Sequence, residues 1–255
     1  MDHPSFTRTT MTLEGRTAVL ALASDKVNAL DVGVLREISA FVEFCEQAPE
    51  VAALVVTGEG PLFSAGLNVT EVLAHDVDYT EVLLGALGDA LLALFGSPLP
   101  TVVAVNGSAI AGGCLLACVF DTRLIAEDAR IGVTELTVGV AFPVLALELL
   151  RHVCGSGAES LVFGAALLDA EAACRVGLAH RSLPGSELRS AAIAEAERLA
   201  SFDPRAYALA KACTRRSVLS AVDTEDSRAI DTRVLAQWQD DTTRAGLGRL
   251  LKPKR

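Results

Sequence analysis

Residues 101–114 read TVVAVNGSAIAGGC, a short apolar run followed directly by a loop of small residues. The apolar run is typical of a strand buried on both faces, and a helix is expected to begin at residues 111–114 and to end near residue 119. A similar transition occurs upstream, where VAALVVTG at residues 51–58 leads to FSAGLN at residues 63–68. In open α/β sheets, ligands bind at the carboxyl ends of the strands, where both loops should lie.

The two loops together predict a site for a developing negative charge. Small residues let a ligand approach the backbone, and free N–H groups at a helix start attract anions. Two such loops side by side would supply two donors to one oxygen, which is the geometry of an oxyanion hole. One loop alone would be explained as well by tight turns and close helix packing. The pair favours the oxyanion hole.

Outward from these loops, strands alternate with helices, which predicts an α/β fold. A strand or hairpin is expected within residues 12–23, and Asp31 is the expected N-cap of a helix that follows it. Other elements expected from the pattern are helices at 80–95 and 145–153, strands at 122–126 and 178–182, and helices from 203 to 251. We therefore predict a core at residues 1–200 and a C-terminal helical region at residues 201–255, which packs on the core or reaches a neighbouring subunit.

The composition narrows the class of protein. The chain has 255 residues, of which 51% are hydrophobic, and a net charge of −10, which argues against nucleic acid as a partner. No apolar run is long enough to predict a membrane span, and no secretory signal is evident. The six cysteines lack CxxC or zinc-ligand spacing, so we expect unpaired thiols, no metal site and a cytoplasmic location.

The loops and their flanking motifs resemble the crotonase superfamily, the enoyl-CoA hydratase/isomerase family. The resemblance covers nearly the whole chain, and its matching positions are Asn28-Ala29-Leu30, Phe63 to Gly66, Val105-Asn106-Gly107, Gly112-Gly113-Cys114, Asp121, Ala129 and Glu135. It implies a spiral of ββα repeats (the ClpP/crotonase fold) with a C-terminal helical trimerisation region. It also implies a trimer or a dimer of trimers, and an acyl-CoA substrate from fatty acid metabolism with no cofactor beyond the coenzyme A that the substrate carries.

The resemblance also assigns roles to individual residues. The amides of Ala65 and Gly112 would bind the thioester carbonyl, and Glu135 would be the acid/base. Substrate and coenzyme A contacts are implied at Lys26, Asn28, Ala29, Phe63, Ser64, Gly66, Leu67, Asn68 and Leu115. Coenzyme A is a polyanion, so Lys26 and the terminal Lys252, Lys254 and Arg255 are candidates for its phosphates, although the terminal group also suits a solvated tail.

The reaction is predicted from one retained and one absent carboxylate. Hydratases of the family use two glutamates, and the first of these positions is Leu115 in this chain. One carboxylate suffices to move a proton between two carbons, which favours a 3-enoyl-CoA to 2-enoyl-CoA isomerase over a hydratase. A hydratase stays possible if Asn68, Glu71 or Asp89 replaces the missing group, and a non-catalytic acyl-CoA-binding protein is the third hypothesis. By itself, Glu135 also suits a helix N-terminus with Thr134 helping to cap it.

Three further side chains are predicted to be structural. His152 and His180 have no partner visible in the sequence. The single tryptophan, Trp238, is expected to pack at a helix contact in the C-terminal region.

Overall fold

The computed structural model describes residues 6–251, and their strands form two sheets. The larger sheet has the order β1-β2-β3-β5-β7-β10 and the smaller one has the order β4-β6-β8-β9. The strands are β1 Thr9–Glu14, β2 Thr17–Leu22, β3 Ala53–Gly58, β4 Leu62–Ser64, β5 Thr101–Val105, β6 Ser108–Ile110, β7 Thr122–Ala126, β8 Arg130–Gly132, β9 Leu168–Asp169 and β10 Arg181–Leu183. The α/β class expected from the sequence is confirmed.

Helices cover the sheets and make up the described chain beyond residue 203. They are α1 Val32–Gln47, α2 Val69–Ala74, α3 Asp78–Gly96, α4 Gly112–Cys118, α5 Val144–Cys154, α6 Gly157–Gly164, α7 Ala170–Val176, α8 Gly185–Ala200, α9 Pro204–Val222, α10 Glu225–Gln239 and α11 Asp241–Leu250. A short 3-10 helix, η1, spans Glu135–Val138. The helix predicted after residue 31 is confirmed, because the Asp31 carboxylate accepts a hydrogen bond from Val34 N at 2.9 Å.

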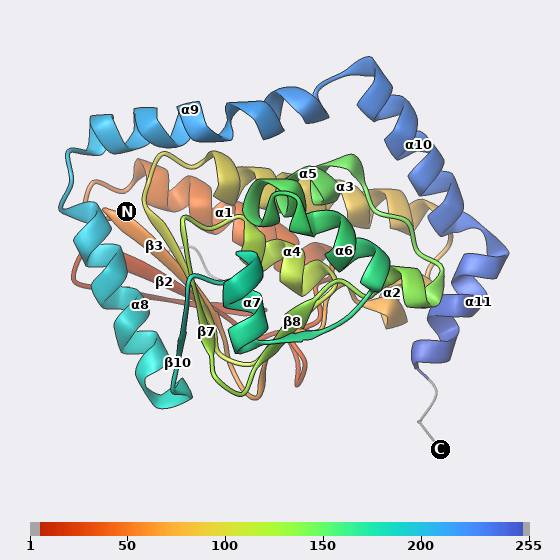
Figure 1. The fold of residues 1–255 in the computed structure, drawn as a ribbon, viewed down its shortest axis with the longest axis horizontal. Helices are drawn as coiled ribbons and strands as arrows, with labels where there is room; N and C mark the ends of the chain where they lie inside the picture. Colours follow the sequence, from red (N-terminus) through yellow and green to blue (C-terminus); the bar gives the residue numbers. More distant parts are fainter. Residues whose placement is uncertain (1–5, 252–255) are drawn as a thin grey trace.

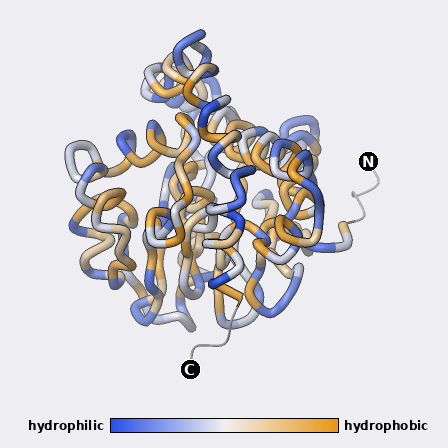
Figure 2. The backbone as a smooth tube through the Cα atoms, turned by 90° about the vertical axis from the view of Figure 1, so that its right-hand side faces the viewer, coloured by the Kyte–Doolittle hydropathy of each residue, from blue (hydrophilic) through white to orange (hydrophobic). Residues whose placement is uncertain are grey.

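The apolar runs form the interior of the larger sheet. Every residue of β2 and β5 is buried, as expected for strands that are covered on both faces. β1 and β2 form an antiparallel hairpin, whereas β2, β3, β5, β7 and β10 pair in parallel. Figure 2, which looks onto the side where α10 and α11 lie, shows hydrophilic and hydrophobic segments alternating along the chain, as amphipathic elements require.

Three consecutive units share one connectivity, and together they make the expected ββα spiral. β3, β5 and β7 lie side by side in the larger sheet, and β4, β6 and β8 follow them in the smaller sheet. A helix comes after each pair. Each chain segment therefore crosses from one sheet to the other before it turns into a helix. The short strands β4, β6 and β8 have three residues each, too few for a periodic signal in the sequence.

The helical layers place the C-terminal region around the core. In Figure 1, α9 runs along one side of the molecule from α8 to α10, and α11 lies near α2.

α3 is long and apolar enough to cross a membrane by length and composition alone. It packs on α1 and buries seven of its side chains, which is the position of a core helix in a globular protein.

One partly buried carboxylate joins α9 to the strands. Asp121 Oδ2 accepts hydrogen bonds from Lys211 Nζ at 2.8 Å and from Tyr207 at 3.0 Å. Its Oδ1 accepts one from Arg215 Nη2 at 2.6 Å. The side chains of Lys211 and Arg215 are each 6% exposed, so Asp121 compensates charges that are largely removed from water. Asp121 also accepts from Thr101 N at 2.8 Å, which fixes the start of β5.

We expect Asp121→Ala to lower the free energy of unfolding by about 3–5 kcal/mol, because it leaves two cations buried without their counter-charge. Urea denaturation at pH 7 measures this loss. The matched control is Asp223→Ala, which breaks the exposed Asp223–Arg228 pair and should cost less than about 1 kcal/mol. Equal losses for the two variants would contradict the role given to Asp121.

Candidate active site

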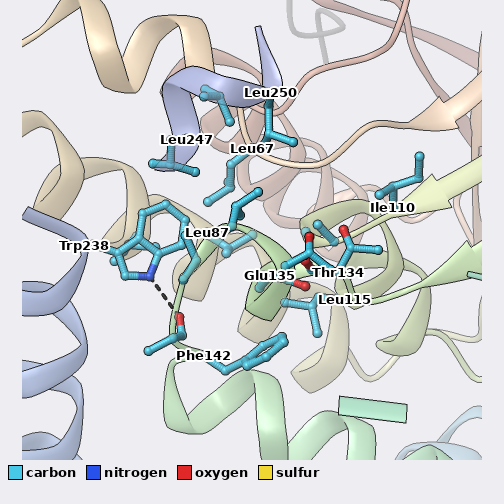
Figure 3. Close-up of a pocket in the computed structure, with 18 of the residues that line it drawn as sticks. Leu67, Leu87, Ile110, Leu115, Thr134, Glu135, Phe142, Trp238, Leu247 and Leu250 are labelled. Atoms are coloured by element: carbon cyan, nitrogen blue, oxygen red, sulfur yellow. Dashed lines mark hydrogen bonds between the residues drawn. The ribbon is translucent and has the colours of Figure 1, made fainter. Parts of the chain in front are cut away.

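An apolar pocket lies where the smaller sheet, α3, α4, η1 and the C-terminal helices meet. Its volume is about 190 Å³, and among its lining residues Glu135 is the one with an ionisable side chain. Figure 3 shows Glu135 beside Leu115 and Thr134 inside the pocket, with Trp238 and Leu247 of the C-terminal helices across from them. A pocket of mostly apolar lining with a few polar groups is the usual form of a small-molecule site.

The two loops predicted from the sequence are brought together at this pocket. β4 and β6 pair in parallel, with Leu62 opposite Ser108 and Ser64 opposite Ala109. The chain after each strand then turns toward the other. A Cβ atom added to Gly66 would lie 3.1 Å from Gly112 N, so the two backbones approach as closely as glycine allows.

The structure corrects the predicted pair of amide donors at one position. The Ala65 N–H already donates to Val27 O at 2.9 Å, so it is engaged within the protein. The Leu67 N–H, two residues further on, has no acceptor among the described residues, and a Cβ added to Gly112 would lie 3.4 Å from it. Ala65 still lines the pocket, but Leu67 supplies the available donor of the first loop.

The second predicted donor has the expected position. Gly112 is the first residue of α4, and its N–H has no acceptor among the described residues. Ala111, just before it, has a φ of 53°, a conformation that residues with a side chain rarely adopt. Hydrogen bonds fix this turn, from Ala111 N to Gly132 O and from Leu115 N to Ala111 O. Backbone strain held in this way is a feature of functional sites.

Glu135 lies at the start of η1 with its carboxyl group buried. The residue is 9% exposed, and its Oε2 has no hydrogen-bond partner among the described residues. Burial raises the pKa of the Glu135 carboxyl to about 7, although hydrogen bonding to the backbone of Glu135 and Thr134 offsets part of the effect. The Thr134 side chain makes no capping hydrogen bond, so the purely structural explanation of Glu135 loses one of its supports.

Leu115 occupies the wall of the pocket beside Glu135, as Figure 3 shows. The residues considered as substitutes for a missing carboxylate lie elsewhere. Asn68 caps α2 by accepting from Glu71 N at 3.2 Å, and Glu71 lies near His75. Asp89 faces a different cavity, between α1 and α3. The described part of the pocket therefore offers one carboxyl group to a bound molecule.

Several residues predicted to contact a ligand stabilise the first loop instead. Asn28 is 1% exposed and donates from Nδ2 to Glu59 O and Leu62 O, both at 2.9 Å. The Ser64 hydroxyl donates to Asn28 O at 2.8 Å and accepts from Gly66 N at 3.1 Å. Phe63 is fully buried in the core. These side chains hold the loop in place and are covered by protein.

The remaining predicted contacts differ in their exposure, and three of them lie outside the described residues. Ala29 is buried beside Asn28, whereas Lys26 is exposed next to Gly60 and Pro61. Lys252, Lys254 and Arg255 lie outside the described residues. His152 and His180 line a different cavity, and burial lowers the pKa of His180 to about 4.

Trp238 is one of the pocket residues whose role the sequence did not reveal. It packs at a helix contact, as predicted, but its ring also lines the pocket, and its Nε1–H donates to Ala141 O at 2.9 Å. Nothing local in the sequence indicates this position, because the partner lies 97 residues away.

The chain is similar to known proteins along nearly its whole length. A family model described as enoyl-CoA hydratase/isomerase matches residues 14–251. The short-chain-enoyl-CoA hydratase of Clostridium acetobutylicum is 31% identical over 217 residues, which cover 83% of this chain and 82% of that protein. Human mitochondrial enoyl-CoA delta isomerase 1 is 29% identical over 82% of this chain and 70% of its own length. The crystal structure of human mitochondrial delta3-delta2-enoyl-CoA isomerase has a TM-score of 0.90 and 25% identity, and covers 96% of this chain and 97% of its own.

Because the pKa of Glu135 is raised, replacing its carboxyl with a neutral amide should raise the free energy of unfolding above pH 7. Its carboxyl binds a proton more tightly in the folded state than in the unfolded state, so its contribution to stability is lost as the pH rises from about 4.5 through about 7. We expect Glu135→Gln to be more stable than the wild type at pH 8, by about 2–3 kcal/mol, and equally stable near pH 4.5. Urea denaturation at both values measures the difference. The control Glu127→Gln, at an exposed position, should show no such pH dependence.

Proposed function

The chain belongs to the enoyl-CoA hydratase/isomerase (crotonase) family, and from this premise we propose that it converts 3-enoyl-CoA to 2-enoyl-CoA with Glu135 as the acid/base. The observation that carries the proposal is the single ionisable side chain among the residues that line the pocket. Family membership implies acyl-CoA substrates, and the apolar lining of the pocket suits an acyl chain. The choice of isomerase over hydratase is our inference.

The proposed reaction moves one proton and two electron pairs. The Glu135 carboxylate removes a proton from C2 of the 3-enoyl group, and the electron pair of the broken C–H bond delocalises onto the thioester oxygen. The Leu67 and Gly112 amides donate hydrogen bonds to that oxygen, which carries negative charge in the resulting dienolate. The Glu135 carboxyl then returns the proton to C4, and the double bond forms between C2 and C3. The enzyme regains its starting charge.

The environment of Glu135 supports this use. A carboxyl group whose pKa is about 7 is divided between its two protonation states near neutral pH, so it can both accept and return a proton. Its Oε2 has no partner within residues 6–251 and is therefore available to a substrate hydrogen. Apolar walls exclude water, which strengthens the hydrogen bonds of the two amides to a charged oxygen.

Leu115 distinguishes the proposed isomerase from a hydratase. Hydration of a 2-enoyl thioester requires a bound water molecule as well as a proton for the substrate, and a leucine side chain can hold neither. The human mitochondrial isomerase, with its TM-score of 0.90, supports the same choice. The Clostridium relative is named a hydratase, so hydration is the alternative that the assay must test.

Three expectations accompany the proposal. We propose that Lys26 contacts the phosphates of coenzyme A, because it is an exposed cation near the first loop. A trimer or dimer of trimers and a cytoplasmic location stay predictions, and sedimentation of the purified chain would test the first of them.

We expect the protein to convert 3-enoyl-CoA to the conjugated thioester without consuming 2-enoyl-CoA. The ultraviolet absorbance of the conjugated thioester follows both substrates in separate reactions. Rapid loss of the absorbance of the 2-enoyl substrate would identify a hydratase. Binding of both esters without any change in absorbance would favour a non-catalytic acyl-CoA-binding protein.

Removal of the Glu135 carboxyl should lower the isomerase kcat by about 10²–10⁴-fold. In the wild type, kcat/KM should fall about tenfold per pH unit as the pH drops below about 7, because protonation removes the base. Steady-state rates of Glu135→Gln and of a pH series measure both effects. Glu127→Gln serves as the control. A fully active Glu135→Gln enzyme would refute the mechanism.

A further inference from the structure

We propose that Trp238 closes the acyl end of the pocket and limits the substrate to acyl chains of about six carbons. The inference rests on the proposed function for one point, the location of the thioester at the Leu67 and Gly112 amides. It adds the length class of the acyl chain and names the residue that limits this length.

Trp238 lies at the closed side of the pocket. Figure 3 shows Trp238 and Ile110 at opposite sides, with Glu135 between them. Ile110 is partly exposed, so the pocket opens on its side, whereas Trp238 is 5% exposed. A chain that enters beside the two loops and passes Glu135 therefore ends against the indole ring.

The indole ring is fixed in its orientation. Its Nε1–H donates to Ala141 O at 2.9 Å, which satisfies the polar atom of a ring that is otherwise buried among apolar groups. The preceding residue, Gln237, accepts from Ala141 N at 3.1 Å through its Oε1. Both polar groups of Ala141 are thus held by α10, and the ring cannot swing aside without breaking a partly buried hydrogen bond.

The volume of the pocket limits the length of the acyl chain that it can hold. The cavity holds about 190 Å³. An apolar protein cavity of about 150 Å³ binds benzene, a molecule of six carbon atoms. The pocket therefore has room for about six carbon atoms, which corresponds to a short acyl chain.

A second, mostly apolar cavity adjoins the first pocket, and Glu81, Arg228 and Asp231 also line it. It has about 540 Å³ and shares Leu84 and Pro143 with the first pocket. Val234, one helical turn before Trp238 on α10, also lines it. Gly85 and Gly88 border the same cavity, with no atom within 4 Å of an added Cβ. Truncation of Trp238 should join the two spaces and give a longer chain somewhere to go.

The test measures the binding of saturated acyl-CoA esters from four to twelve carbons, by titration calorimetry. For the wild type, Kd should fall about fourfold per added methylene up to about six carbons and then stop falling or rise. For Trp238→Ala, the fall should continue to at least ten carbons. kcat/KM for 3-enoyl-CoA esters of increasing length should shift in the same way.

Three variants separate pocket length from other effects. Trp238→Leu makes a smaller change and keeps the test valid if Trp238→Ala does not fold. Trp238→Phe keeps a ring but loses the N–H, and it should retain a limit close to that of the wild type. Ile230→Ala truncates an exposed apolar side chain of the same helix that lines neither cavity, so its length profile should match the wild type.

An unchanged length limit in both Trp238→Ala and Trp238→Leu would overturn the proposal, as would a wild type that binds twelve-carbon esters best. Saturated esters do not react, so their binding series stands apart from catalysis. A shifted series in a protein without isomerase activity supports the role of Trp238 and refutes the isomerase alone.

Discussion

Backbone-to-backbone contact between the two loops is the constraint on which the site depends. β4 and β6 pair in parallel, and beyond them the chain segments meet with no room for side chains. A Cβ at Gly113 would lie 2.5 Å from Ser64 O, and one at Gly66 would lie 2.8 Å from Ile110 O. Glycine at these positions is therefore a steric requirement. The same approach brings the free N–H groups of Leu67 and Gly112 next to each other.

Burial of Glu135 makes the site useful and costs stability. The apolar walls that would hold an acyl chain also remove water from the carboxyl group, which raises its pKa to about 7. At neutral pH the protein thus keeps a partly charged group in an apolar pocket, with one oxygen that has no partner among residues 6–251. A structure selected only for stability would place a neutral group there, so the position is better explained by chemistry than by packing.

The sequence predicted the α/β class, the strands β5 and β7, the cap at Asp31 and the pairing of the two loops, because each depends on local patterns. It assigned the first donor to Ala65, two residues before the amide that is free. The composition of a loop shows that its amides can be exposed, but it does not show which amide is free. In this loop the Val27 carbonyl, which is distant in the chain, accepts the hydrogen bond of Ala65 N. For the same reason the sequence indicated Trp238 only as a packing residue. Its contact with Ala141 joins segments that are distant in the chain, so no local pattern could place it in the pocket.

The C-terminal helices link the shape of the pocket to the position of its carboxyl group. The segment after η1 leaves polar backbone groups that need partners, and α10 supplies them. Gln237 donates to Gly139 O and accepts from Ala141 N, while Trp238 donates to Ala141 O. Gly139 in turn ends the 3-10 helix that begins at Glu135. A movement of α10 would change the pocket and displace Glu135 together, whereas a substitution of the Trp238 ring changes the pocket with less effect on the helix. Substrate length is therefore expected to vary through side chains at this wall while the backbone of α10 stays fixed.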